Sequence, residues 1–93
     1  MKSTLKILFA DDDLKYSLVL KRFLEREGYE VTYTGNGTMA LEQFPVVKPD
    51  LVLLDINMPG LNGFEVAEKI REAVSNRSLR WPFLCLQKKS GKL

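Results

Sequence analysis

Two groups of aspartates have the residue type and the position in the chain that a cation site needs. Asp11, Asp12 and Asp13 directly follow one apolar run, and Asp55 ends another. Because the carboxyl ends of neighbouring parallel strands meet at one edge of an open sheet, we expect these carboxylates to converge there. Their mutual repulsion must then be offset, most simply by a divalent cation with a preference for oxygen ligands.

Length and composition predict a single soluble domain over residues 1–93. The chain is 45% hydrophobic and 28% charged, which is ordinary for a globular protein and argues against disorder or a fibrous repeat. No apolar stretch approaches the roughly 20 residues that span a bilayer, and the first residues do not resemble a signal peptide. We therefore expect a cytoplasmic location and no membrane partner.

Charge and residue usage exclude several kinds of site. The net charge of +2 is too small to argue for nucleic acid, and the basic residues near the end of the chain are expected to be solvated. The chain contains no histidine, which removes His-based zinc sites and histidine-activated nucleophiles. The single cysteine, Cys85, stands in an apolar run and is predicted to be a small core residue.

Apolar spacing predicts strands that alternate with helices, which indicates an α/β sheet with right-handed crossovers. The expected strands are residues 5–10, 29–34, 50–55 and 82–86. The expected helices are residues 14–27, residues 38–44 and a helix that opens at Asn62 and Gly63. Asp13 is expected to cap the first helix, Gly28 to end it, and Pro45 and Pro49 to close the second.

Helical spacing also predicts which faces of these helices are buried. The expected inward residues of the first helix are Tyr16, Val19, Leu20, Phe23 and Leu24. Those of the last helix are Phe64, Ala67, Ile70 and Val74.

Three stretches together resemble the receiver domain of two-component response regulators. They are residues 7–13 (ILFADDD), 55–60 (DINMPG) and 62–65 (NGFE). The resemblance extends over essentially the whole chain. It implies a flavodoxin-like, doubly wound parallel sheet with helices on both faces. The sheet is expected here as a truncated receiver of strand order 2-1-3-4, without the fifth strand of the family.

The resemblance also implies roles for the acidic residues. Asp55 would be the phosphoacceptor, taking a phosphoryl group from a histidine kinase or phosphotransfer protein. Asp12 would ligate Mg²⁺ or Mn²⁺ directly and Asp11 through water, with Asp55 and the backbone carbonyl of Asn57 as further ligands. A module with these roles accepts a signal and is not an enzyme.

The end of the chain departs from the family pattern in two places. Gln87 stands where the family has a Ser or Thr whose hydroxyl contacts the phosphoryl group. The family also has a lysine at the end of strand 5. Lys88, Lys89 and Lys92 carry the same charge, but their spacing in the sequence does not place any of them at that position. A fourth strand at the edge, together with an incompletely covered first helix, predicts a homodimer through these two elements.

Two alternatives to a phosphoaccepting receiver stay open. A degenerate receiver that serves only in dimerisation or docking is favoured by Gln87 and the missing lysine. A phosphatase of the haloacid dehalogenase type is suggested by the Asp11-x-Asp13 pattern after a strand. That type is disfavoured because Lys15 stands where its motif has Thr or Val.

Overall fold

The computed structural model describes residues 4–77 and 82–87, which form one parallel sheet with helices on both faces. The sheet has four strands in the order β2-β1-β3-β4, and every neighbouring pair is parallel. The strands are β1 (Lys6–Ala10), β2 (Glu30–Thr34), β3 (Leu51–Asp55) and β4 (Phe83–Gln87). The helices are α1 (Leu14–Arg26), α2 (Gly37–Val47) and α3 (Gly63–Arg77). The fold class and strand order predicted from the sequence are confirmed.

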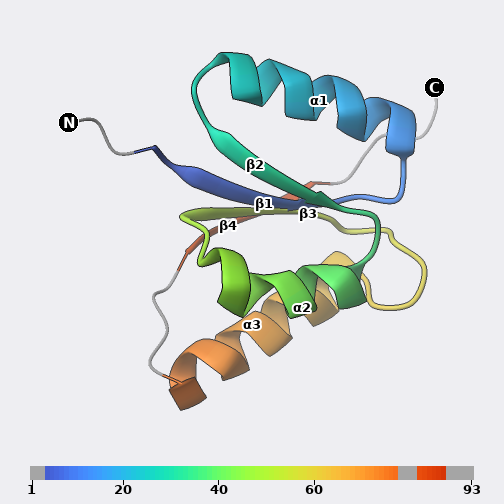
Figure 1. Cartoon of the computed structure of the whole chain (residues 1–93). Helices are drawn as coiled ribbons and strands as arrows, with labels where there is room; N and C mark the ends of the chain where they lie inside the picture. Colours follow the sequence, from blue (N-terminus) through green and yellow to red (C-terminus); the bar gives the residue numbers. More distant parts are fainter. Residues whose placement is uncertain (1–3, 78–81, 88–93) are drawn as a thin grey trace.

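Helices α2 and α3 lie on one face of the sheet and α1 on the other (Figure 1), and an apolar cluster on each face holds them to it. Helices α2 and α3 pack on one face, around a cluster that includes Leu8, Val52 and Ile70. Helix α1 packs on the other face, around Ile7, Phe9 and Val31. The central strands β1 and β3 are mostly apolar, as expected of strands that are paired on both edges and packed on both faces.

The ends of α1 match the prediction, but its buried face is narrower than predicted. The Asp13 carboxylate accepts a hydrogen bond from the Tyr16 N–H at 3.1 Å, which caps the helix. Gly28 follows the helix with a φ of 98°, a backbone conformation that glycine adopts without strain. Ser17 is buried, whereas Val19 and Phe23 are 70% and 54% exposed. Of the predicted face, Leu20 and Leu24 pack against the apolar cluster on this side of the sheet.

Helix α2 extends beyond the proline that was predicted to close it. Pro45 lies inside the helix, which continues to Val47 and ends at Lys48, whose φ is 52°. The prediction of an end at Pro45 is wrong, because the φ of proline is itself helical and a last turn can follow. The helix does end before Pro49, the other proline predicted to close it. At the other end, the Asn36 side chain accepts a hydrogen bond from the Met39 N–H at 2.8 Å.

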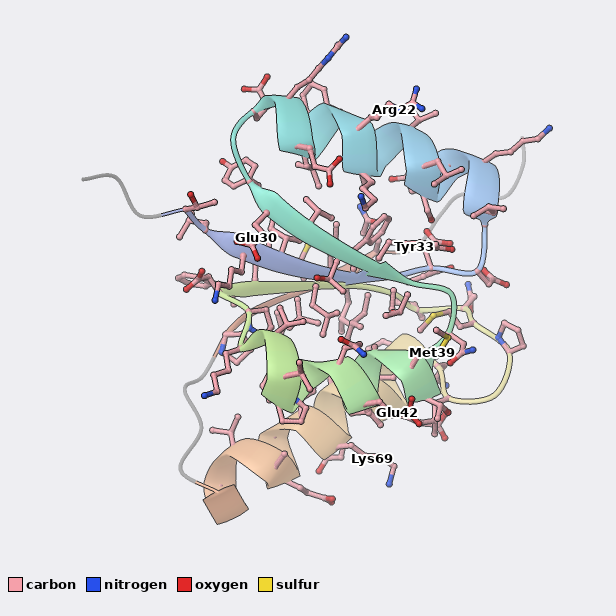
Figure 2. All side chains as sticks on the ribbon, in the orientation of Figure 1. Arg22, Glu30, Tyr33, Met39, Glu42 and Lys69 are labelled. Atoms are coloured by element: carbon pink, nitrogen blue, oxygen red, sulfur yellow. The ribbon has the colours of Figure 1, made fainter. Side chains whose placement is uncertain are left out.

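The buried face of helix α3 differs from the predicted one at its first turn. Val66, Ile70 and Val74 are buried, whereas Phe64 is 57% exposed, so the inward position of Phe64 is a wrong prediction. Asn62 and Glu65 form a capping box, in which each side chain accepts the other's backbone N–H at 2.9 Å. Lys69 points away from the sheet into solvent (Figure 2).

Strand β4 is covered on one face only, which corrects the prediction for Cys85. Leu84 and Leu86 pack into the cluster below the sheet with α2 and α3. Cys85 and Phe83 leave the strand on the other side and are exposed, because α1 packs over β2 at the far edge of the sheet. No helix among the described residues is long and apolar enough to cross a bilayer.

Candidate acidic site

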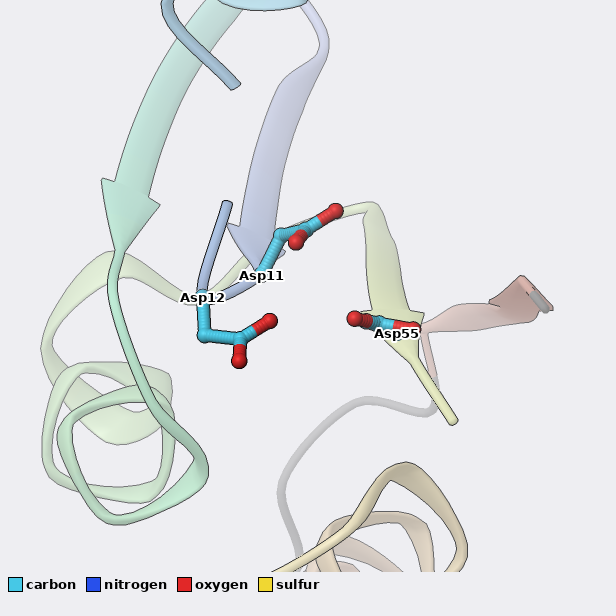
Figure 3. A group of neighbouring side chains, drawn as sticks. All are labelled: Asp11, Asp12 and Asp55. Atoms are coloured by element: carbon cyan, nitrogen blue, oxygen red, sulfur yellow. The ribbon is translucent and has the colours of Figure 1, made fainter. Parts of the chain in front are cut away.

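Three aspartates converge at the carboxyl edge of the sheet. Asp11 and Asp12 follow β1, and Asp55 is the last residue of the neighbouring strand β3. One carboxylate oxygen from each residue lies within 4.8 Å of the others, and the three side chains face a common space (Figure 3). The structure thus brings together the acidic residues that the sequence placed at neighbouring strand ends.

Asp11 is fixed by the end of β2 and by the start of α1. Asp11 is fully buried, and its Oδ1 accepts a hydrogen bond from the Asp13 N–H at 2.9 Å. Its backbone N–H donates to the Thr34 carbonyl at 3.2 Å, and its own carbonyl accepts the Tyr33 hydroxyl at 2.7 Å. Figure 2 shows Tyr33 on the α1 side of the sheet. The position of Asp11 is therefore held from three sides.

Asp55 is equally buried, at 2% exposure, but it is fixed by the loop that follows β3. Its Oδ1 accepts the Asn57 N–H at 3.2 Å. The neighbouring Ile56 carbonyl accepts the Gly63 N–H at 3.1 Å, which ties the start of α3 to the end of β3. The loop predicted from turn residues thus serves to orient the carboxylate of Asp55.

The other predicted residues lie around this trio in different roles. Asp12 is exposed, and Asp13 lies outside the cluster as the cap of α1. Asn57 is exposed and contributes its N–H to Asp55, while a role for its carbonyl as a ligand stays a prediction. Gln87 ends β4 directly in register with Asp55. Lys88, Lys89 and Lys92 lie outside the described residues.

The donor set suits a hard divalent cation. Three carboxylates this close repel one another, and two of them are almost completely buried, so a bound positive charge would relieve their repulsion. Mg²⁺ takes oxygen ligands and keeps part of its water shell, so a few carboxylates facing an open side are an appropriate set. Sequence reasoning missed Tyr33 and Gly63 as supports of this site. The Asn62-Gly63 pair was visible only as a helix start, and no sequence signal connected Tyr33 to Asp11.

Sequence and structure comparisons agree with this geometry. The profile of the response regulator receiver domain matches residues 7–81. The alkaline phosphatase synthesis transcriptional regulatory protein PhoP of Bacillus subtilis is 38% identical over 84 residues, which cover 90% of this chain and 33% of that protein. The sensor protein EvgS of Escherichia coli is 42% identical over 72 residues, 77% of this chain and 6% of that protein.

A solved structure adds the same fold with higher coverage. The response regulator TrrA of Thermotoga maritima, in complex with Mg²⁺-BeF, superposes with a TM-score of 0.81 and is 36% identical. The match covers 95% of this chain and 72% of that one. The chain spans a third or less of the first curated relatives that it matches. By profile, sequence identity and fold, this chain belongs to the family of response regulator receiver domains.

Proposed function

We propose that Asp55 is the phosphoacceptor of a two-component phosphorelay and that Asp11 and Asp12 hold Mg²⁺ beside it. The observation that carries this proposal is the convergence of three carboxylates within 4.8 Å at the carboxyl edge of the sheet. Membership in the receiver family supports it. The donor is inferred to be the phosphohistidine of a histidine kinase or of a phosphotransfer protein.

The reaction needs little covalent machinery from this chain. A carboxylate oxygen of Asp55 forms a bond to phosphorus while the phosphorus–nitrogen bond of the donor breaks, and the electron pair of that bond stays with the imidazole. Bound Mg²⁺ supplies positive charge that offsets repulsion between the phosphoryl group and the acidic cluster. The Asn57 N–H donates to Oδ1 of Asp55 and so helps to hold the carboxylate in one orientation.

The experiment is incubation with Mg²⁺ and acetyl phosphate, followed by intact mass. We expect a phosphate adduct in the unchanged chain and none in Asp55→Asn. Asp13→Asn is the matched control, because asparagine still caps α1 and the residue lies outside the acidic trio. An adduct that persists in Asp55→Asn would refute the assignment. Replacing Mg²⁺ by Mn²⁺ tests whether the second metal also supports the reaction.

The same experiment separates the two alternatives. A chain that binds Mg²⁺ but forms no adduct would be a degenerate receiver that acts through docking alone. Turnover of free phosphomonoesters would identify a phosphatase instead. We infer a signalling module without turnover of its own, so phosphomonoesters should remain intact.

A homodimer and a cytoplasmic location remain predictions. On the described part of the chain, β4 pairs with β3 on one side only, and Phe83 is 80% exposed. On α1, Val19 and Phe23 are exposed as well. An apolar strand edge and helix face of this kind favour contact with a second copy. Sedimentation at micromolar concentration tests this, and a stable folded monomer would contradict it.

A further inference from the structure

Gln87 stands beside the proposed phosphoacceptor on the neighbouring strand. It is paired in register with Asp55, and its carbonyl accepts the Ile56 N–H at 2.9 Å, so the ladder continues to the edge of the sheet. The preceding pair, Leu54 and Leu86, packs into the cluster with α2 and α3. Because side chains alternate along a strand, Asp55 and Gln87 both leave the sheet on the side opposite to that pair.

The carboxamide oxygen of Gln87 lacks a hydrogen-bond donor among the described residues. This atom, Oε1, is buried. Buried side-chain oxygens in folded proteins are almost always paired, and an exception points to an ordered water or an ion. The oxygen is an acceptor, so what it requires is a donor or a cation.

We propose that Gln87 is an outer-shell support of the cation site, where its Oε1 accepts a hydrogen bond from a water that a divalent cation carries. This inference rests on the proposed function for the cation site. Mg²⁺ usually keeps several of its waters, and these waters are strong donors. A neutral amide oxygen meets such a water without adding a fourth negative charge to the trio of Asp11, Asp12 and Asp55. Gln87 is thus a positioning residue for the hydrated cation.

The test compares Mg²⁺ affinity by isothermal titration calorimetry in the unchanged chain and in Gln87→Met, which keeps the length of the side chain but removes the acceptor. Loss of a residue that orients a metal site typically weakens metal binding by 10- to 100-fold, so we expect about a tenfold weaker affinity. The only other glutamine, Gln43 on α2, supplies the matched control as Gln43→Met and should leave the affinity unchanged. Equal affinities in the two variants would overturn the proposal.

A second measurement separates this role from a merely structural one. Without metal, Gln87→Met removes a buried acceptor for which the described residues supply no donor, so its melting temperature should equal or exceed that of the unchanged chain. Gln87→Glu should bind Mg²⁺ more tightly, because it brings a charged oxygen toward the cation. Weaker Mg²⁺ binding accompanied by a large loss of stability without metal would indicate a packing role and contradict the proposal.

The outcomes also distinguish this inference from the proposed function. If Gln87→Met binds Mg²⁺ normally while the unchanged chain forms its adduct at Asp55, only the role of Gln87 fails. If Gln87→Met loses affinity but no adduct forms in any variant, phosphoacceptance fails and the role of Gln87 stands. If Gln87→Met keeps its affinity for Mg²⁺ but loses affinity for beryllofluoride, the carboxamide contacts the phosphoryl group instead, which overturns the proposal.

Discussion

Gly63 is the position where the packing of α3 and the placement of Asp55 depend on one missing methyl group. It is the first residue of α3, and its N–H donates to the Ile56 carbonyl. A Cβ at this position would lie 2.7 Å from the Asp55 carbonyl oxygen and 3.0 Å from the Ile56 Cα. Both are backbone atoms of the β3 end, so neither can turn away as a side chain would.

Gly63→Ala should therefore destabilise the fold by a measurable amount. Overpacking that forces backbone shifts costs about 1–3 kcal/mol. Alanine recovers up to about 1 kcal/mol through its higher helix propensity. With about 2 kcal/mol taken for the overpacking, the expected net loss is about 1–2 kcal/mol in the free energy of unfolding, a substantial part of the ~5–15 kcal/mol of a typical domain.

Urea denaturation followed by far-ultraviolet circular dichroism measures this loss. Gly35→Ala is the matched control, because its added Cβ would meet only the Tyr33 hydroxyl at 3.8 Å, an ordinary contact. That variant should be as stable as the unchanged chain or slightly more so, since alanine restricts the unfolded state. If Gly63→Ala proved as stable as Gly35→Ala, α3 would not be packed against Asp55 as described.

Three further predictions follow from caps, core and metal. Asp13→Ala should lose about 1 kcal/mol in an equilibrium urea titration by removing the acceptor for Tyr16, and an unchanged stability would contradict the cap. Ile70→Ala should cost about 2–5 kcal/mol in the same titration because Ile70 is fully buried, whereas Lys69→Ala should stay within about 0.5 kcal/mol; similar losses in both would contradict the orientation of α3. Mg²⁺ at about 100 times its dissociation constant should add about 2.7 kcal/mol, seen as a higher melting temperature. That gain should shrink in Asp12→Asn, and an undiminished gain would place the ion elsewhere.

The central strands were predictable because they are buried on both faces. The predicted strands 5–10 and 50–55 are mostly apolar, with an aspartate after the first and at the end of the second, and β1 and β3 lie within them, each starting one residue later. The convergence of their carboxylates follows from the parallel order alone. The approach of their oxygens to within 4.8 Å of one another does not follow from that order, because it also depends on the hydrogen bonds that orient Asp11 and Asp55.

The wrong predictions concern which side chains of a helix or strand are buried. Val66, Ile70 and Val74 are spaced four residues apart and share one helix face, whereas Phe64 lies about a third of a turn away from Ile70, so the choice of Phe64 as an inward residue was the error. The start of α3 packs closely on the Asp55 carbonyl at Gly63, and Val66 is fully buried. Cys85 stands in a run as apolar as β1, but α1 does not reach across the sheet to cover it.

The three aspartates differ in how firmly the fold holds them, and this difference assigns them different parts in cation binding. Asp11 and Asp55 are buried and accept backbone N–H groups, so their positions are set before any ion arrives. Asp12 is exposed, and no hydrogen bond to its carboxylate is found within residues 4–77 and 82–87. A cation that enters the site therefore orders mainly Asp12, at the cost of one side chain's freedom rather than a rearranged backbone. Because Asp11 also accepts the N–H of the residue that caps α1, replacing Asp11 would disturb the helix start together with the site, whereas replacing Asp12 would remove only the proposed ligand.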